Sequence, residues 1–203
     1  GNSVINPNGI QVRIYSSDGP STTIIDGEDS RRGIECSSGE TSGFILEGFT
    51  ITRGLLLGNT GGGLYCKNVS PAFVDCTFES NTAGTNGGGA HCSNGAPTFT
   101  NCRFISNVAN RGAGVNTFRS AVTFNGCTFA GNTAGSWGGG LYSYGTSSTG
   151  TVLQLSDCTF EDNTSVSGGG IFFRIFDNIC TSSITIIFFS RIIFNFLGWV
   201  YHF

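Results

Sequence analysis

The chain has 203 residues and a formal net charge of -3, and 11% of its residues are charged. This length allows one buried core, and the charge excludes a basic patch for nucleic acid and an acidic tail. The 32 Gly residues predict many turns between short strands rather than long helices, because Gly destabilises helices. The chain starts at Gly1 and contains no Met, so we expect a fragment or a processed chain.

In chain order, the first regular feature is a repeat with a spacing of about 25 to 30 residues. Each copy has Gly, an apolar residue, a variable residue and then Cys, Thr or Ser. The copies are Gly33-Ile34-Glu35-Cys36, Gly63-Leu64-Tyr65-Cys66, Gly89-Ala90-His91-Cys92, Gly114-Val115-Asn116-Thr117, Gly140-Leu141-Tyr142-Ser143 and, less regularly, Gly170-Ile171-Phe172-Phe173. A repeat of this period is typical of stacked architectures, in which a unit cannot bury its apolar face alone.

A second set of columns lies between these steps. A Cys column is followed two residues later by a Phe column, and three residues after that by an Asn column. The members are Cys76, Cys102, Cys127 and Cys158; Phe78, Phe104, Phe129 and Phe160; and Asn81, Asn107, Asn132 and Asn163. An earlier row has Phe73, Phe99, Phe124 and Leu155. Within each copy the apolar period is 2, as in a strand with one buried face.

These patterns predict an all-β fold, a right-handed parallel β-helix of about five complete coils over residues 1–170, incomplete at its N-terminus. Phe and Cys columns then stack inside the coil. The Asn column lies at a bend, where Asn tolerates unusual dihedral angles and its amide can bond to the next coil. The Gly triplets mark tight turns before the next strand. A leucine-rich horseshoe and a β-propeller fit the period and composition less well.

The tetrads "FESN", "FISN", "FAGN" and "FEDN", each followed by a Gly-rich turn, resemble the repeats of polymorphic outer membrane proteins and of pectin-lyase-like β-helix proteins. The segments "GPSTTIIDGEDSRRGIEC" and "ILEGFTITRG" are similar to the first coils of bacterial β-helix proteins. The resemblance covers roughly residues 10–173. It implies a secreted or surface domain, often adhesive, although a shared fold alone does not establish function.

Residues 171–203 lose the repeat pattern and are rich in Ile and Phe, with a single Gly. Four interpretations stay open: a cap on the end of the solenoid, a membrane segment, the end of a barrel strand, or a translation artefact. Membrane contact is expected only through this tail, if it is native.

Catalytic and metal sites find little support in the sequence. Asp75 and Asp157 share a column but are separated by the coils of Asn101 and Gly126, too far apart for paired acid and base. The sequence contains no C-x-x-C motif and no His at ligand spacing, so no zinc site is predicted. No cofactor is expected. The Cys columns are expected mainly as buried thiols, with some disulfides as the alternative. Arg31 and Arg32 are expected to pair with nearby acids in a turn.

The outward positions of the first column form the best candidate binding site. We expect Glu35, Tyr65, His91, Asn116, Tyr142 and Phe172 to form an exposed stripe, with Tyr65, His91, Asn116 and Tyr142 as ligand-binding residues. Aromatic faces beside hydrogen-bonding groups suit sugar rings. Alternatively, the rings only stabilise the sheet by cross-strand stacking.

The sequence therefore predicts an extracellular or cell-surface domain that is structural and adhesive and presents a rigid surface to polysaccharides or surface proteins. One alternative is a fragment of a pectin-lyase-like polysaccharide lyase or hydrolase. The other is a structural spacer that binds nothing.

Overall fold

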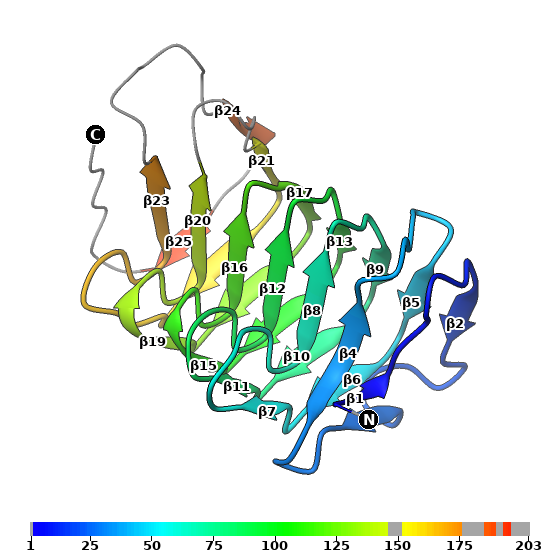
Figure 1. The fold of residues 1–203 in the computed structure, drawn as a ribbon. Coiled ribbons are helices and arrows are strands. Elements are labelled where there is room, and N and C mark those ends of the chain that lie inside the picture. Colours follow the sequence, from blue (N-terminus) through cyan, green and yellow to red (C-terminus); the bar gives the residue numbers. More distant parts are fainter. Residues whose placement is uncertain (1, 146–151, 176–184, 190–192, 196–203) are drawn as a thin grey trace.

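The fold is a solenoid built only from parallel strand pairs (Figure 1). A computed structural model describes residues 2–145, 152–175, 185–189 and 193–195. Four sheets, here called A, B, C and D, run along the solenoid axis, and each turn of the chain contributes one strand to most of them. Seven strands in each of sheets A, B and C correspond to about six turns, one more than the expected five complete coils. The additional turn starts at the N-terminus, where the tetrad motif is missing.

The strands are short, and their bounds follow the repeat. Sheet A contains β1 (Ser3–Ile5), β4 (Arg32–Cys36), β8 (Leu64–Lys67), β12 (Ala90–Ser93), β16 (Val115–Phe118), β20 (Leu141–Gly145) and β23 (Ile171–Ile175). Sheet B contains β2 (Arg13–Tyr15), β5 (Ile45–Glu47), β9 (Ala72–Val74), β13 (Thr98–Thr100), β17 (Ala121–Asn125), β21 (Val152–Ser156) and β24 (Thr185–Phe189). Sheet C contains β3 (Ile24–Asp26), β6 (Thr50–Thr52), β10 (Thr77–Glu79), β14 (Arg103–Ile105), β18 (Thr128–Ala130), β22 (Thr159–Glu161) and β25 (Ile193–Asn195). Sheet D contains β7 (Leu55–Leu56), β11 (Thr82–Ala83), β15 (Val108–Arg111) and β19 (Thr133–Trp137).

The predicted inward columns form the core. Phe78, Phe104 and Phe129 are in register on successive strands and fully buried, and Phe160 continues the column. Neighbouring rings stack with centroids 4.4 to 5.0 Å apart. The parallel row of Phe73, Phe99 and Phe124 meets them edge to face. Such offset and edge-to-face contacts are favourable beyond the area that they bury.

The Asn column bonds the coils together, as predicted. The Asn107 side-chain Nδ2 donates to the Phe78 carbonyl at 2.9 Å and to Asn132 Oδ1 at 3.0 Å, and its Oδ1 accepts from the Asn81 backbone N–H at 3.0 Å. The predicted dihedral reason is wrong, because the left-handed backbone falls one residue earlier, at the residues that precede the four asparagines: Ser80, Ser106, Gly131 and Asp162. Asn is therefore selected here for its amide and not for its backbone.

The Gly triplets have two distinct physical causes. The first Gly of a triplet has positive φ, as at Gly87 with 66°, which L side chains rarely adopt. The third Gly has no room for a side chain: a Cβ on Gly89 would lie 2.5 Å from the Gly114 carbonyl oxygen. The chain therefore makes its tight turn and enters sheet A at the expected place.

The described parts of the C-terminal tail continue the sheets. β23 pairs with β20, β24 with β21 and β25 with β22, all in parallel. The remainder of the tail lies outside the described residues, and the boundary at residue 170 stays a prediction. Within the described ranges, no helix is long and apolar enough to cross a membrane.

Candidate functional site

The outward column of sheet A is in register as predicted, but most of it is not exposed. His91 pairs with Tyr65 on one side and with Asn116 on the other, and Asn116 pairs with Tyr142. His91 is 6% exposed, Asn116 0% and Tyr142 1%, while Tyr65 is half-buried. Phe172, at the end of the same column, is also buried. The predicted exposed stripe is thus wrong for every one of these residues except Tyr65, in part.

The column is covered by the turns that precede its own strands. We call the residues before the first Gly of each turn the turn ladder: Asn86, Arg111, Trp137 and Ser167. They pair with one another along the axis. The turns lie close to the strands that follow, since a Cβ on Gly87 would lie 2.9 Å from the His91 backbone nitrogen and one on Gly112 2.9 Å from Asn116 Cα. Alternation along a strand reveals which residues point outward, but not that a turn folds back over them.

An aromatic surface with arginines forms around the later strands of sheet A, and we call it the aromatic patch. Tyr144 stacks on Phe118 at 4.6 Å and on Tyr142 at 4.9 Å, and Trp137 stacks on Phe172 at 6.0 Å. Its members are Phe118, Trp137, Tyr142, Tyr144, Phe172, Arg111, Arg119 and Arg174. Phe118, Trp137 and Tyr144 are half-buried and give the patch its accessible ring surface.

Guanidinium groups lie against the rings of the patch. Arg111 lies 4.6 Å and Arg174 5.3 Å from the centre of the Trp137 ring, and Arg119 lies 4.8 Å from that of Phe118. Such cation–π contacts are worth about 0.5 to 1 kcal/mol at exposed sites. The strands from β8 to β23 in sheet A contain no Asp or Glu, so this face is positive although the chain is negative overall.

The ionisable groups of the face respond to burial. Burial raises the pKa of Tyr142 and of Tyr144, and nearby arginines oppose the shift, so both phenols stay neutral and able to donate a hydrogen bond. Burial lowers the pKa of His91 to about 4. The Asn116 amide opposes that shift and the Arg32 charge adds to it, but the amide and the ring do not reach hydrogen-bond geometry. His91 is therefore neutral at pH 7.

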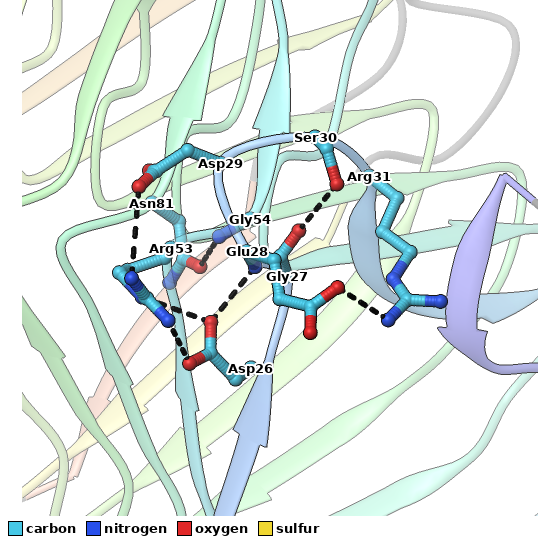
Figure 2. Close-up of polar contacts among 9 residues, drawn as sticks. All are labelled: Asp26, Gly27, Glu28, Asp29, Ser30, Arg31, Arg53, Gly54 and Asn81. Atoms are coloured by element: carbon cyan, nitrogen blue, oxygen red, sulfur yellow. Dashed lines mark hydrogen bonds and ion pairs between the residues drawn. The ribbon is translucent and has the colours of Figure 1, made fainter.

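A charged cluster near the N-terminus brings Arg53 of the next coil against acids of the turn that contains Asp26, Glu28, Asp29 and Arg31 (Figure 2). Arg53 Nε donates a hydrogen bond to Asp26 Oδ1 at 2.9 Å, and Arg53 Nη2 donates to Asp26 Oδ2. Arg53 Nη1 lies 4.0 Å from Asp29 Oδ2. Arg31 pairs with Glu28 as expected. Hydrogen bonds from Arg53 and from the Glu28 backbone lower the pKa of Asp26. The cluster is a set of mutually paired charges at a turn.

Arg32 departs from the predicted turn role. It lies in β4, is buried, pairs with Glu35 at 2.8 Å and donates to the Gly61 carbonyl at 2.8 Å. Its guanidinium also lies 4.6 Å from the centre of the Tyr65 ring. Arg32 thus fixes the first turn over sheet A.

Seven cysteines are free and buried, as the buried-thiol expectation required: Cys36, Cys66, Cys76, Cys92, Cys102, Cys127 and Cys158. Cys102 Sγ, for example, donates to the Phe73 carbonyl at 3.5 Å. Burial raises the pKa of Cys66 and of Cys102, so these thiols stay protonated. Among the described residues, no group of three or more His, Cys, Asp or Glu side chains could hold a metal ion.

The acids considered for catalysis stay apart. Asp75 and Asp157 both precede a core cysteine in left-handed backbone, with the coils of Asn101 and Gly126 between them. This spacing does not present a pair of carboxylates to one substrate bond.

Comparison with known proteins agrees with the parallel coils. Residues 1–187 match the family model described as "Right handed beta helix region". The chain belongs to the right-handed β-helix family. Its solenoid of about six turns is therefore a right-handed β-helix, and the pectin-lyase-like group is a coarser description of it. No curated protein and no solved structure matches this β-helix.

Of the predicted binding residues, the structure places only Tyr142 in the aromatic patch. Tyr65 and His91 lie on the earlier strands β8 and β12, and Asn116 lies on β16 beside the patch member Phe118 but makes no ring contact with the described residues. Sequence reasoning missed Trp137 and the arginines because they precede or follow the repeated motif. The one signal available was the position before the first Gly of each turn, where Arg111 and Trp137 stand in successive copies.

Proposed function

We propose that this β-helix is a structural and adhesive domain of an exported protein, which presents its aromatic patch to glycans at a cell surface or in the extracellular space. The observation that carries the proposal is the set of half-buried rings Phe118, Trp137 and Tyr144 on one rigid parallel sheet. The apolar face of a sugar packs on the face of a ring, and neighbouring guanidinium and hydroxyl groups form hydrogen bonds with its polar edges.

A rigid sheet suits this role because binding then orders few groups. The rings are held by stacking contacts and by the parallel ladder, so little conformational entropy is lost when a ligand lies on them. The solenoid axis also aligns the rings in one direction, which matches an extended chain of sugar units.

The test is glycan-array binding by the full chain, compared with the double variant Trp137→Ala/Tyr144→Ala. The matched control is Tyr15→Ala, which removes a ring that is 65% exposed and lies under Arg13 on another sheet. We expect at least about tenfold weaker binding in the double variant, equivalent to about 1.4 kcal/mol, and no weakening in the control. Equal binding by the wild type and both variants would reject the patch.

The lyase and spacer alternatives give different results in the same experiment. A polysaccharide lyase forms an unsaturated product that absorbs in the ultraviolet, so product formation from an acidic polysaccharide would favour the enzyme. A folded wild-type chain that binds no glycan and forms no product would favour the spacer.

A further inference from the structure

Two buried asparagines close together in the chain differ in their hydrogen bonding. Asn107 and Asn116 are both 0% exposed. Both polar atoms of the Asn107 amide are paired within the Asn column. Neither Oδ1 nor Nδ2 of Asn116 has a hydrogen-bond partner in the described part of the chain. The fold is thus able to pair a buried amide fully and does not do so at Asn116.

Asn116 belongs to a group of four neighbouring residues with unpaired polar atoms, which we call the polar notch: Asn86, His91, Arg111 and Asn116. The unpaired atoms of its other members are Asn86 Oδ1, His91 Nδ1 and Arg111 Nε, and all are buried among the described residues. His91 and Asn116 pair across β12 and β16, and Asn86 and Arg111 pair in the turn ladder that covers these strands. The notch therefore spans two successive coils.

Unpaired buried polar atoms lower the stability of a fold, and native proteins contain few of them. Departures of this kind are expected where a sequence is selected for binding and not only for folding. These four residues carry five such atoms: three accept hydrogen bonds or can do so, and two donate. A partner that pairs them has to offer both donors and acceptors.

Aromatic rings lie on both sides of the notch along the axis. On the N-terminal side Tyr65 stacks on His91 with centroids 5.6 Å apart and planes 11° apart. On the C-terminal side Trp137 and Tyr142 begin the aromatic patch. The notch thus lies where a sugar chain on the patch would continue towards the earlier coils.

We propose that the polar notch binds neighbouring hydroxyl groups of a neutral sugar unit. This inference rests on the proposed function, because it assigns the ligand class of the same face. Asn116 Nδ2 and Arg111 Nε donate to the hydroxyl oxygens, while the Oδ1 atoms of Asn116 and Asn86 accept the hydroxyl protons. A carboxylate in place of these hydroxyl groups only accepts hydrogen bonds and would leave both Oδ1 atoms unpaired, so the notch matches hydroxyl groups better than a carboxylate.

Entry to the notch depends on the turn ladder. Asn86 and Arg111 are only half-buried, and the Arg111 guanidinium lies over the Trp137 ring. Displacement of the Arg111 guanidinium from the Trp137 ring opens the notch without unfolding the sheet, and Nε stays available to donate to the ligand. A ligand that lies on Trp137 replaces the guanidinium there, which couples the two events.

The test measures binding of cellohexaose, xylohexaose and maltohexaose, with hexagalacturonate as the acidic probe, by calorimetry on the full chain. Asn116→Leu keeps the size of the side chain and removes the amide. We expect at least about tenfold weaker binding of the preferred neutral hexasaccharide and an unchanged or higher Tm, since an unpaired amide is lost. Asn125→Leu, an exposed asparagine on β17 in the same coil, is the matched control and should bind as the wild type does.

A second variant, Asn86→Ala in the turn, distinguishes a lost binding group from a misfolded chain. It should also weaken binding, while its circular dichroism spectrum stays that of the wild type. Wild-type affinity in both Asn116→Leu and Asn86→Ala, with binding lost in Trp137→Ala/Tyr144→Ala, overturns the notch and leaves the patch standing. Preference for hexagalacturonate over every neutral probe also overturns the notch. Failure of the wild type to bind any of the four overturns the notch, and failure to bind any glycan on the array as well overturns both proposals.

Discussion

The backbone N–H of Asn81 donates to Oδ1 of Asn107 at 3.0 Å, although the two residues are 26 positions apart in the chain. The Asn107 backbone N–H repeats this bond to Asn132, and Asn132 repeats it to Asn163. Each amide also caps a carbonyl of the preceding coil, as Asn107 Nδ2 does for Phe78. The column is thus a continuous chain of hydrogen bonds along the axis.

Asn107→Ala should lower the free energy of unfolding by roughly 2 to 5 kcal/mol, because the Asn81 N–H and the Phe78 carbonyl lose their buried partner. Urea unfolding followed by circular dichroism measures the change. Asn125→Ala, on an exposed position, should stay within about 0.5 kcal/mol of the wild type. A loss below that limit in Asn107→Ala would contradict the structural role of the column.

Phe104→Ala should cost roughly 3 to 5 kcal/mol, since it empties one tier of two meeting stacks. The Phe104 ring is fully buried between Phe78 and Phe129, with centroids 5.0 Å from each. The same urea experiment measures it, with the exposed Tyr15→Ala as control. A near-zero effect would mean that this column is not the core.

The stability of the wild type should fall as the pH drops from 6.5 to 4, by an amount that depends on His91. Its pKa is about 4 in the folded chain and about 6.5 when unfolded, so protons bind preferentially to the unfolded state in this range. The contribution of the neutral ring is complete above pH 6.5 and is lost towards pH 4. At about 1.4 kcal/mol per pKa unit, the loss is roughly 3 kcal/mol.

The variant His91→Tyr isolates this contribution, because Tyr occupies the same column at positions 65 and 142. Urea unfolding at several pH values gives the difference in the free energy of unfolding between the wild type and the variant. The carboxylate titrations are common to both proteins and cancel in this difference. The difference should change by the stated amount between pH 7 and pH 4. A constant difference would show that the ring is solvated.

The seven core thiols should resist alkylation in the folded chain. Each is buried and therefore inaccessible to the reagent, and for Cys66 and Cys102 burial also raises the pKa, which removes the reactive thiolate of these two. Iodoacetamide labelling followed by peptide mass spectrometry should modify them only in denaturant. Rapid labelling of Cys66 without denaturant would contradict the burial of its column, and a disulfide between native core cysteines would contradict the thiol assignment.

Much of the fold follows from the repeat, because a parallel ladder places equivalent residues side by side. The equal spacing from Phe78 to Phe104 and from Cys76 to Cys102 therefore predicts the register of neighbouring coils, and β10 and β14 pair in that register. The first turn was expected only as an incomplete coil because β1, β2 and β3 carry no Phe-x-x-Asn tetrad. The end of the chain beyond residue 195 lies outside the described residues.

The candidate site was less predictable. Alternation identified His91 and Asn116 as outward residues, and they do point away from the core. Their burial depends on Gly87 and Gly112, whose positive φ turns the chain back over sheet A. A turn direction of this kind is a three-dimensional property, so a column pattern does not reveal it. The patch at Trp137 depends on the same turns.

The Asn column also bears on how the chain is made. Its inter-coil bonds join residues 25 to 34 positions apart, so a coil needs only its immediate neighbour to complete these contacts. Early coils are therefore able to assemble while later ones are still being synthesised. Each finished coil then acts as the template on which the next one is laid down.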